Sequence, residues 1–294
     1  GRRRAFLLLV QHPHLLDEAV ALQAATQSGA APAAGDAAAV PLPDTFDGRT
    51  HPGYANMIGP FGGVTAATLL NAMAIHPARL GEPLALTVNY AAAVADGAFR
   101  IHAAPLRTNR STQHWRAELL QEGGVLASAT AVFAQRRETW SSTEIGFPQV
   151  PPAEALPATT LKRVEWTRRY DLRFVDGGFP DFSLGAAAGD SQTRLWMRDE
   201  PPRPLDFVSL AALCDVFFPR IFLRRRQFTP AGTVSMTIYF HADGPMLAAQ
   251  GTAHVLGVAR AQHFRNGFFD QSAEVWGADG ALLATTHQIV YFKE

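Results

Sequence analysis

One carboxylate in this sequence stands where a charge is energetically costly. Asp215 falls within residues 207–218, an almost wholly apolar stretch whose pattern predicts a helix buried on all sides. An unpaired carboxylate in such surroundings is strongly disfavoured, so we expect it to have a partner or a chemical task. Burial also raises the pKa of a carboxyl group, which makes it a better base at neutral pH. Asp215 is therefore a candidate general base; the alternative is a carboxylate that caps a neighbouring loop.

No residue stands out as a covalent nucleophile. Ser183 lies in Asp181-Phe-Ser-Leu-Gly185, which lacks the Gly-x-Ser-x-Gly pattern of a nucleophile elbow. Cys214, the only cysteine, directly precedes Asp215, whose negative charge disfavours a thiolate. The ten histidines include no His-Glu-x-x-His pair and no cluster typical of a metal site. The sequence thus predicts direct attack by water, without a metal or a cofactor.

A glycine-containing segment, Gly59-Pro-Phe-Gly-Gly63, precedes a second apolar stretch at residues 64–73. It lacks the Gly-Lys-Ser/Thr ending of a phosphate-binding loop. Glycines at the start of a helix allow close approach of other groups, and the exposed N–H groups there can bind an oxyanion or a carbonyl oxygen. Gly62 and Gly63 are therefore candidates for substrate binding, with a purely conformational role as the alternative.

Composition excludes several classes of protein. Lys+Arg and Asp+Glu balance at 26 each, so the chain lacks the positive charge expected of a protein that mainly binds nucleic acid. No apolar run approaches the roughly 18 residues needed to cross a membrane. The apolar stretch after Arg2-Arg3-Arg4 is shorter than a signal-peptide core of roughly 7–15 residues. With Cys214 as the only cysteine, these features predict a cytoplasmic protein with a non-secretory N-terminal extension.

Two blocks of the chain follow the same order of elements. Each begins with an apolar helix and continues with strand-like runs that are separated by Asp-Gly or Gly-Gly turns. Leu86-Thr-Val-Asn-Tyr90 parallels Met236-Thr-Ile-Tyr-Phe240, about 150 residues apart, and Gly124-Val-Leu-Ala-Ser-Ala-Thr parallels Gly280-Ala-Leu-Leu-Ala-Thr-Thr at a similar offset. The predicted strands are residues 84–90, 98–106, 112–121 and 125–136 in the first block, and 232–241, 246–258, 266–276 and 281–292 in the second.

The repeated plan predicts an α+β fold of the double hotdog type, in which an antiparallel sheet curls round a buried helix twice over. We expect a flexible N-terminal extension over residues 1–45, because residues 29–43 are rich in Ala, Pro and Gly. A first unit spans residues 46–146, and a connector spans 147–200 and begins with a Pro-rich segment. The second unit spans residues 201–294.

These motifs together resemble the acyl-CoA thioesterase II family from about residue 46 to the end. The helix that ends in Leu210-Ala-Ala-Leu-Cys-Asp215, the strand Thr233-Val-Ser-Met-Thr-Ile-Tyr-Phe-His241 and the segment Thr285-Thr-His-Gln288 are similar to three motifs of that family. The Arg107-Thr-Asn-Arg-Ser-Thr-Gln113 segment resembles the family's Arg-x-Gly-x-Ser-like stretch that meets the ligand, with Asn109 in the place of the glycine.

The resemblance implies a fold, a site and a reaction. In the family, an aspartate, a threonine and a glutamine hold and polarise one water, which assigns these roles to Asp215, Thr233 and Gln288. A hydroxyl and an amide can each donate and accept hydrogen bonds, as this role requires. The resemblance places Arg110 on the ligand, acyl-CoA as the substrate and a homo-oligomer as the assembly. In this fold Arg224-Arg-Arg226 can also meet the phosphates of coenzyme A, although a solvated loop is the plainer reading.

Two other functions stay open at the level of the sequence. A hydratase or dehydratase acting on an enoyl thioester needs a histidine paired with a carboxylate; His51 is the nearest candidate, and no carboxylate is suitably spaced in the sequence. A non-catalytic acyl-CoA binder would keep the fold without turnover. The three intact motif residues, Asp215, Thr233 and Gln288, favour hydrolysis over a non-catalytic binder.

Overall fold

The computed structural model describes residues 13–25, 44–160, 163–184 and 189–294. The Ala/Pro/Gly-rich segment 29–43, which we predicted as a linker, lies outside the described residues, as does the Arg2-Arg3-Arg4 start. The elements before residue 140 are α1 (Leu15–Ala19), β1 (Gln23–Ala24), β2 (Asp44–Arg49), α2 (Gly62–Ala74), β3 (Glu82–Tyr90), β4 (Ala98–Thr108), β5 (Thr112–Gln121) and β6 (Gly124–Ala134). Those after it are β7 (Tyr170–Asp176), β8 (Thr193–Asp199), α3 (Phe207–Leu213), α4 (Ile221–Arg225), β9 (Ala231–Phe240), α5 (Gly244–Gln250), β10 (Val255–Arg260), β11 (Phe264–Arg265), β12 (Phe268–Trp276) and β13 (Leu282–Phe292). Short 3-10 turns at Pro52–Tyr54, Ala153–Ala155, Glu165–Arg169 and Phe182–Leu184 complete the described structure.

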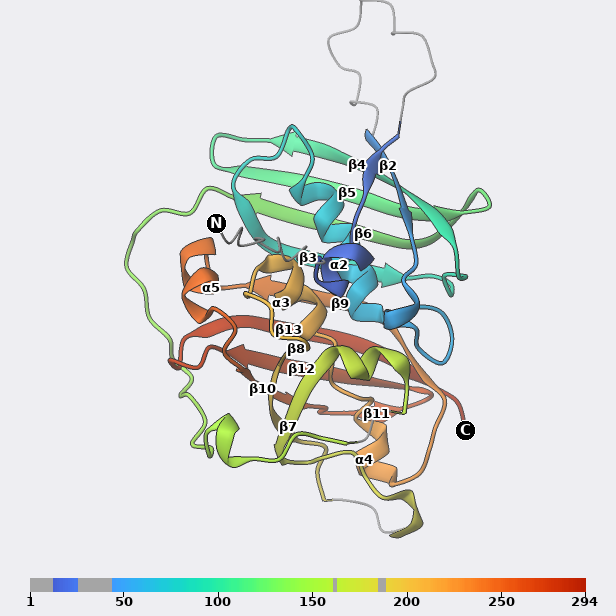
Figure 1. The fold of residues 1–294 in the computed structure, drawn as a ribbon, viewed down its shortest axis with the longest axis vertical. Coiled ribbons are helices and arrows are strands. Elements are labelled where there is room, and N and C mark those ends of the chain that lie inside the picture. Colours follow the sequence, from blue (N-terminus) through green and yellow to red (C-terminus); the bar gives the residue numbers. More distant parts are fainter. Residues whose placement is uncertain (1–12, 26–43, 161–162, 185–188) are drawn as a thin grey trace, which may run out of the picture.

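The strands form one antiparallel sheet. Its order is β1-β2-β4-β5-β6-β3-β9-β13-β12-β10-β8-β7, with β11 paired to β12 as a thirteenth strand. Helices α2 and α3 lie side by side across the middle of one face of this sheet (Figure 1). Within the described part of the chain, no helix combines the length and apolar character needed to cross a bilayer.

The two halves of the chain meet where β3 pairs with β9. Thr87 lies opposite Thr237, and their hydroxyl oxygens are 2.9 Å apart. Leu86 pairs with Ile238 on one side of this contact, and Val88 pairs with Met236 on the other. The two sequence echoes around Thr87 and Thr237 therefore face each other in antiparallel register. This is the arrangement that two similar units related by an approximate twofold axis would have.

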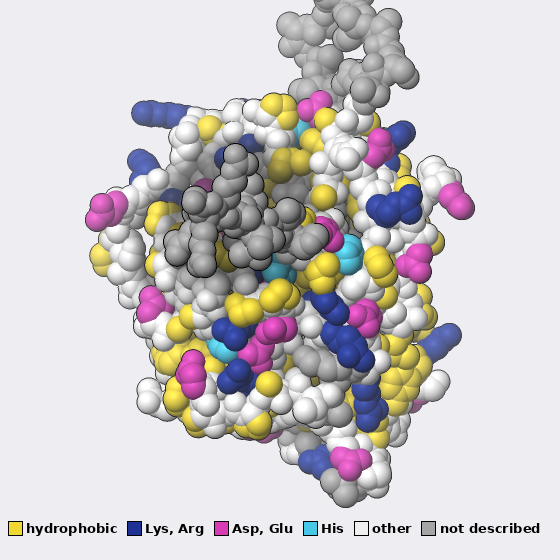
Figure 2. Space-filling model, in the orientation of Figure 1, with side chains coloured by type: hydrophobic (Ala, Val, Ile, Leu, Met, Phe, Trp, Pro, Cys, Tyr) yellow, Lys and Arg dark blue, Asp and Glu magenta, His cyan; other side chains and the backbone are white. Residues whose placement is uncertain are grey.

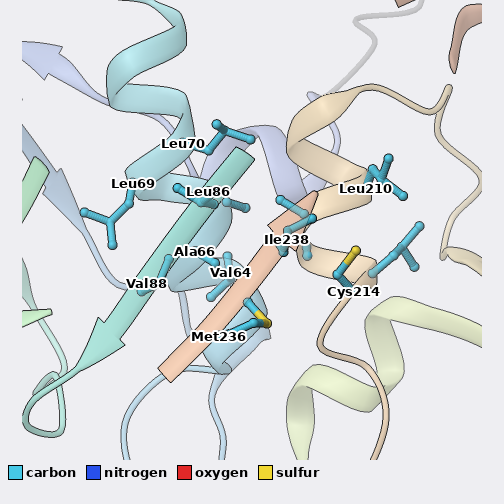
Figure 3. Packing of buried hydrophobic residues seen from close by; sticks show 14 of the residues in the cluster. Val64, Ala66, Leu69, Leu70, Leu86, Val88, Leu210, Cys214, Met236 and Ile238 are labelled. Atoms are coloured by element: carbon cyan, nitrogen blue, oxygen red, sulfur yellow. The ribbon is translucent and has the colours of Figure 1, made fainter. Parts of the chain in front are cut away.

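The core lies between this central pair of strands and the two helices. Figure 3 shows Val64, Ala66, Leu69 and Leu70 of α2, with Leu210 and Cys214 of the α3 region, packed over Leu86, Val88, Met236 and Ile238; all of these side chains are buried. Helix α2 presents buried residues on nearly every side, as the absence of a polar face predicts.

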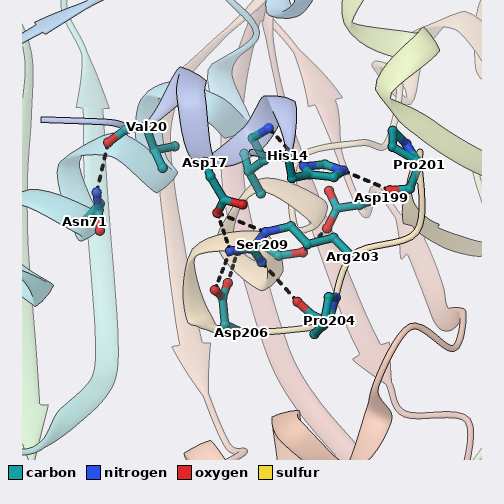
Figure 4. Close-up of polar contacts among 11 residues, drawn as sticks. His14, Asp17, Val20, Asn71, Asp199, Pro201, Arg203, Pro204, Asp206 and Ser209 are labelled. Carbon is teal, nitrogen blue, oxygen red and sulfur yellow. Dashed lines mark hydrogen bonds and ion pairs between the residues drawn. The ribbon is translucent and has the colours of Figure 1, made fainter. Parts of the chain in front are cut away.

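Residues 13–25 belong to the folded body, so the prediction of a flexible extension over residues 1–45 is wrong for this segment. The Leu16 side chain is fully buried in the core. Arg203 bonds both Asp17 on α1 and Asp206 at the start of α3, as Figure 4 shows. The Asn71 side chain of α2 donates to the Val20 carbonyl oxygen at 2.9 Å. Apolar burial and polar contacts thus hold α1 against α2 and α3.

The connector predicted over 147–200 also needs correction, since β7 and β8 join the sheet beside β10. Its Pro-rich start is ordered, because the Trp196 indole N–H donates to the Pro151 carbonyl oxygen at 2.8 Å. Phe147 and Ala153 pack with Trp196 and Trp276 in a small separate cluster. The division into two hotdog units therefore stays a prediction, with the second unit gaining β7 and β8.

Two element predictions in the second block are wrong. Residues 246–258 were predicted as one strand, but they contain the end of α5 and the beginning of β10. Asp243 caps α5 by accepting a hydrogen bond from the Met246 N–H, so its Asp-Gly pair starts a helix instead of a hairpin. The apolar helix predicted to run to residue 218 ends at Leu213, because the Asp215 N–H bonds the Ala212 carbonyl three residues back and the chain turns.

The contact between the halves predicts a large effect of one core substitution. Leu86→Ala removes a fully buried side chain at the β3–β9 pairing and is expected to lower the free energy of unfolding by about 2–5 kcal/mol. Leu84→Ala is the matched control on the same strand, because Leu84 is 37% exposed. Urea denaturation of both variants measures the difference; an equal loss in the two would contradict the assignment of Leu86 to the core.

Candidate active site

Asp215 faces the beginning of α2. Its Oδ1 accepts a hydrogen bond of 2.9 Å from the Gln288 Nε2, and its carboxylate also accepts one from the Gly63 backbone N–H. The first N–H groups of an α-helix have no partner within the helix and carry partial positive charge. The start of α2 therefore supplies a donor and a favourable field to a carboxylate that comes from the turn after α3.

The protonation of Asp215 is balanced between burial and these hydrogen bonds. The pKa of its carboxyl group is raised from 3.8 to about 7, because burial raises it more than the hydrogen bonds from Gln288 and Gly63 lower it. A carboxylate with a pKa near 7 is present at neutral pH and accepts a proton more readily than an exposed aspartate. The surroundings of Asp215 thus raise its pKa in the direction that we predicted from the sequence.

Gln288 connects Asp215 to Thr233. Residues of β13 alternate between buried and exposed, and Gln288 occupies one of the inward, buried positions. Its Oε1 accepts the Thr233 hydroxyl at 3.0 Å, while its Nε2 donates to Asp215 and lies 3.4 Å from the Met236 sulfur. Since an ionised carboxylate can only accept, the nitrogen of the amide must face Asp215. The amide orientation is therefore fixed by Asp215, and the Thr233 hydroxyl donates to the amide oxygen that faces it.

A β-bulge brings Thr233 into this chain of contacts. Gln288 pairs with Met236, and Ile289 pairs with Ser235, but Val290 pairs with Thr233 and leaves Val234 as the extra residue of β9. Thr233 and Met236 are three positions apart, so in a regular strand their side chains would point to opposite faces. The bulge removes this mismatch and directs the Thr233 hydroxyl inward, which is a common use of bulges beside functional sites.

Gly62 and Gly63 are required by the close approach of α2 to Asp215 and α3. A Cβ atom on Gly62 would lie 2.7 Å from the Asp215 Oδ2. One on Gly63 would lie 2.6 Å from the Ala212 carbonyl oxygen and 2.5 Å from the Phe61 ring. Both candidate glycines are thus brought together with Asp215.

Tyr90 is a member of the cluster that we did not predict. Its hydroxyl donates to the Gly62 carbonyl oxygen at 2.9 Å, and it lies 3.6 Å from the position of a Cβ on Gly62. Burial, with a contribution from the negative charge of Asp215, raises the pKa of its phenol well above the usual value. Tyr90 ends the strand that echoes the second block, but an aromatic residue in a strand gives no functional signal in the sequence.

Arg110 does not join these residues. It is exposed in the turn between β4 and β5. Thr112, at the beginning of β5, pairs with Ala134 of β6, and Ala134 pairs with Glu82 at the beginning of β3. Tyr90, whose hydroxyl bonds Gly62 beside Asp215, lies at the other end of β3. Arg110, which the resemblance places on the ligand, therefore does not lie near the Asp215 cluster of the same chain.

The remaining candidates have other surroundings. Burial and the neighbouring Asp215 raise the pKa of the Cys214 thiol, which keeps it protonated. The Ser183 hydroxyl donates to Asp181 at 2.7 Å and is exposed. The His51 Nε2 lies 3.4 Å from the Glu18 carboxylate, a partner distant from it in the sequence. Glu18 comes from α1, which explains why the spacing near His51 did not indicate it.

Two features bear on what this region can bind: the arrangement of possible metal ligands in the described part of the chain, and a narrow cavity along α2. Among the residues that the structure describes, no three His, Cys, Asp or Glu side chains group as a metal site would require. A narrow cavity of about 20 Å³ follows α2 and is lined by Val64, Thr65 and Thr68 together with Val94, Phe99 and Leu119. Its size suits about one water molecule, so an acyl chain beside α2 requires these side chains to move.

Comparison with known proteins identifies the family. A family model described as the acyl-CoA thioesterase N-terminal domain matches residues 51–134, and one described as the C-terminal domain matches residues 147–292. Comparison with curated proteins gives no match.

Solved structures agree with the family models. A conserved protein with a hot dog fold from Alicyclobacillus acidocaldarius is 46% identical, with a TM-score of 0.86 over 96% of this chain and 99% of that one. A putative thioesterase II from Thermobifida fusca is 15% identical (TM-score 0.76; 95% and 97% of the two chains). An acyl-CoA thioesterase II from Mycobacterium marinum is 17% identical (TM-score 0.68; 95% and 98%). The last two likenesses concern the fold alone. The chain belongs to the acyl-CoA thioesterase family and is a thioesterase.

Proposed function

We propose that this protein hydrolyses acyl-CoA to a free carboxylic acid and coenzyme A by direct attack of water, with Asp215 as the general base. One observation carries the proposal. A buried carboxylate whose pKa is raised to about 7 faces the first turn of a helix, and one of its oxygens is held by an amide. The general base therefore lies beside the first turn of α2, whose N–H groups would bind the carbonyl oxygen, and acyl transfer to water requires both.

The chemical steps follow from this geometry. A water oxygen attacks the thioester carbon while Asp215 takes one of its protons. The carbonyl oxygen gains negative charge and accepts a hydrogen bond from the N–H of Gly62, which has no acceptor within the helix because it lies in the first turn. The tetrahedral intermediate then expels the coenzyme A thiolate, which receives the proton held by Asp215. The carboxylate is regenerated, and no covalent acyl-enzyme forms.

Gln288 and Thr233 divide their tasks in this proposal. Gln288 uses its amide to hold Asp215 and to accept from Thr233, so we assign it to positioning the base. The Thr233 hydroxyl donates to Gln288 and keeps its own lone pairs for a water proton. This refines the expectation that both residues share the water, and it leaves Thr233 as the one that contacts it.

The architecture proposed with this function is a double hotdog with one catalytic cluster per chain. The antiparallel contact of Thr87 with Thr237 supports a pair of similar units. A homo-oligomer and a cytoplasmic location remain predictions from the sequence. Size-exclusion chromatography with light scattering tests the first.

The hydratase alternative gains a specific observation in the contact of His51 with Glu18, which borders the narrow cavity on α2. Both side chains are partly exposed, and the pair includes none of the residues around Asp215. Crotonyl-CoA distinguishes the two reactions, since hydration removes its conjugated double bond and hydrolysis releases a thiol. Binding without either reaction would instead identify an acyl-CoA-binding protein.

Asp215→Asn is expected to reduce catalysis strongly, because the amide cannot take a proton from water. Free-thiol release from acyl-CoAs of graded chain length measures this, and kcat should fall about 10²–10⁴-fold at the preferred length. Asp96→Asn, in an exposed turn, is the matched control and should retain activity. If Asp215→Asn releases thiol as fast as the wild type, the thioesterase activity is established but the assignment of Asp215 as its base is refuted.

The same substitution is expected to stabilise the fold at alkaline pH. Because the folded pKa of Asp215 is raised to about 7, the folded state is favoured when this group is protonated, and stability is lost as the pH rises from about 4 to about 7. Asparagine avoids this loss, which amounts to at most about 4 kcal/mol. Thermal unfolding should therefore show a higher Tm for Asp215→Asn at pH 8 than for the wild type, and little difference at pH 4. Equal Tm values at pH 8 would contradict the raised pKa.

A further inference from the structure

A second, open groove lies at the far end of β13. It has a volume of about 720 Å³ and is lined by Ile221, Arg224 and Arg225 of α4, by Phe264 to Gly267 of the β11–β12 turn, and by Phe292 and Glu294 at the end of the chain. The lining combines arginine side chains with aromatic rings. Its volume falls within the range of pockets that hold cofactors and nucleotides, about 300–1,000 Å³.

The charge of this groove is strongly positive. Arg224, Arg225 and Arg265 line it, and Glu294, which bonds Arg225, is the one acidic residue among the lining side chains. On the face of the molecule that Figure 2 shows, Lys and Arg side chains lie in a line that runs downward from the centre. Arg226, which the sequence suggested, is not in the lining; it ends α4 with a left-handed backbone, and Arg265 takes its place.

A buried cation adds to this field. Arg220 directly precedes α4 and is fully buried. Its guanidinium donates to the Phe218 and Ser191 carbonyl oxygens and to the Thr193 hydroxyl, and no carboxylate of the described residues forms an ion pair with it. Neutral partners leave its charge uncompensated in surroundings that screen it poorly. The groove beside α4 is therefore suited to a ligand with several negative charges.

The position of the groove matches the length of a coenzyme A substrate. Gln288 and Phe292 occupy inward positions of β13, four residues and thus about 13 Å apart. About 13 bonds separate the sulfur of coenzyme A from its first phosphorus, and an extended chain with that number of bonds spans roughly 14–16 Å. Val290, between the two positions, is buried with Ile221 and Phe222, so the pantetheine arm would pass along the side of α4.

We propose that this groove binds the phosphate-bearing end of coenzyme A, its 3′-phosphorylated ADP. Arg225 and Arg265 contact the phosphates, with Arg224 contributing to the positive field, and Phe264 forms an apolar wall for the adenine. Arginine suits this role because its planar guanidinium forms two parallel hydrogen bonds to one phosphate. The inference rests on the proposed function and names the part of the substrate that gives the enzyme its affinity for coenzyme A esters.

The test compares one acyl group on two carriers, coenzyme A and pantetheine, because pantetheine lacks the nucleotide. Arg225→Ala and Arg265→Ala should each raise the KM for acyl-CoA about 10-fold and leave the kinetics with acyl-pantetheine unchanged. Glu294→Gln should lower the KM for acyl-CoA, since it frees Arg225 from its acidic partner. Arg100→Ala, an exposed arginine paired with Asp47 in the other half of the chain, is the matched control.

The outcomes separate this inference from the proposed function. If both carriers are hydrolysed and the arginine variants affect them equally or not at all, the groove is not the nucleotide site, although the thioesterase stands. If the wild type hydrolyses the thioester of neither carrier, the proposed function fails. Calorimetry with adenosine 3′,5′-bisphosphate then tests, independently of activity, whether the groove binds the nucleotide. Binding that is lost in Arg225→Ala and Arg265→Ala supports it, and no binding by the wild type overturns it.

Discussion

The hydrogen bond from the Gln288 amide to Asp215 is the interaction on which the site depends. It joins β13 of the sheet to the turn after α3, and through the Thr233 hydroxyl it reaches the neighbouring strand β9. Each partner requires a particular feature of the backbone: an inward position for Gln288, a bulge for Thr233, and a helix that stops two residues before Asp215. The fold therefore holds the Gln288 amide in one position, and that amide in turn orients Asp215.

This arrangement trades stability for reactivity. Burial of Asp215 is unfavourable for folding when the group is ionised, and it is the cause of the raised pKa that suits a base. The two donors, Gln288 and the Gly63 N–H, offset only part of this cost. The core between α2, α3 and the β3–β9 contact, with Leu86 and Ile238 fully buried, supplies the compensating stabilisation.

Much of the site could be predicted because its residues differ in type from those expected in their sequence surroundings. Asp215 is a charge in an apolar helix, and the glycines before α2 mark a close approach. The Thr233 orientation could not be deduced from periodicity, since the bulge at Val234 reverses the alternation that a strand predicts. Other errors arose because one local pattern has two structural meanings. The Asp243-Gly pair suits a hairpin turn, but here it begins α5. Residues 13–25 appeared flexible because the residues that hold α1 are distant in sequence.

The pH dependence of kcat/KM in the wild type and in Gln288→Leu tests whether Asp215 is the base and whether Gln288 sets its pKa. In the wild type, activity should rise with pH through about 7, as the Asp215 carboxyl loses its proton. In Gln288→Leu the residual activity should rise at a higher pH, because the lost hydrogen bond lowered the pKa of Asp215. The same inflection in both proteins would show that Gln288 does not set the pKa of the catalytic base.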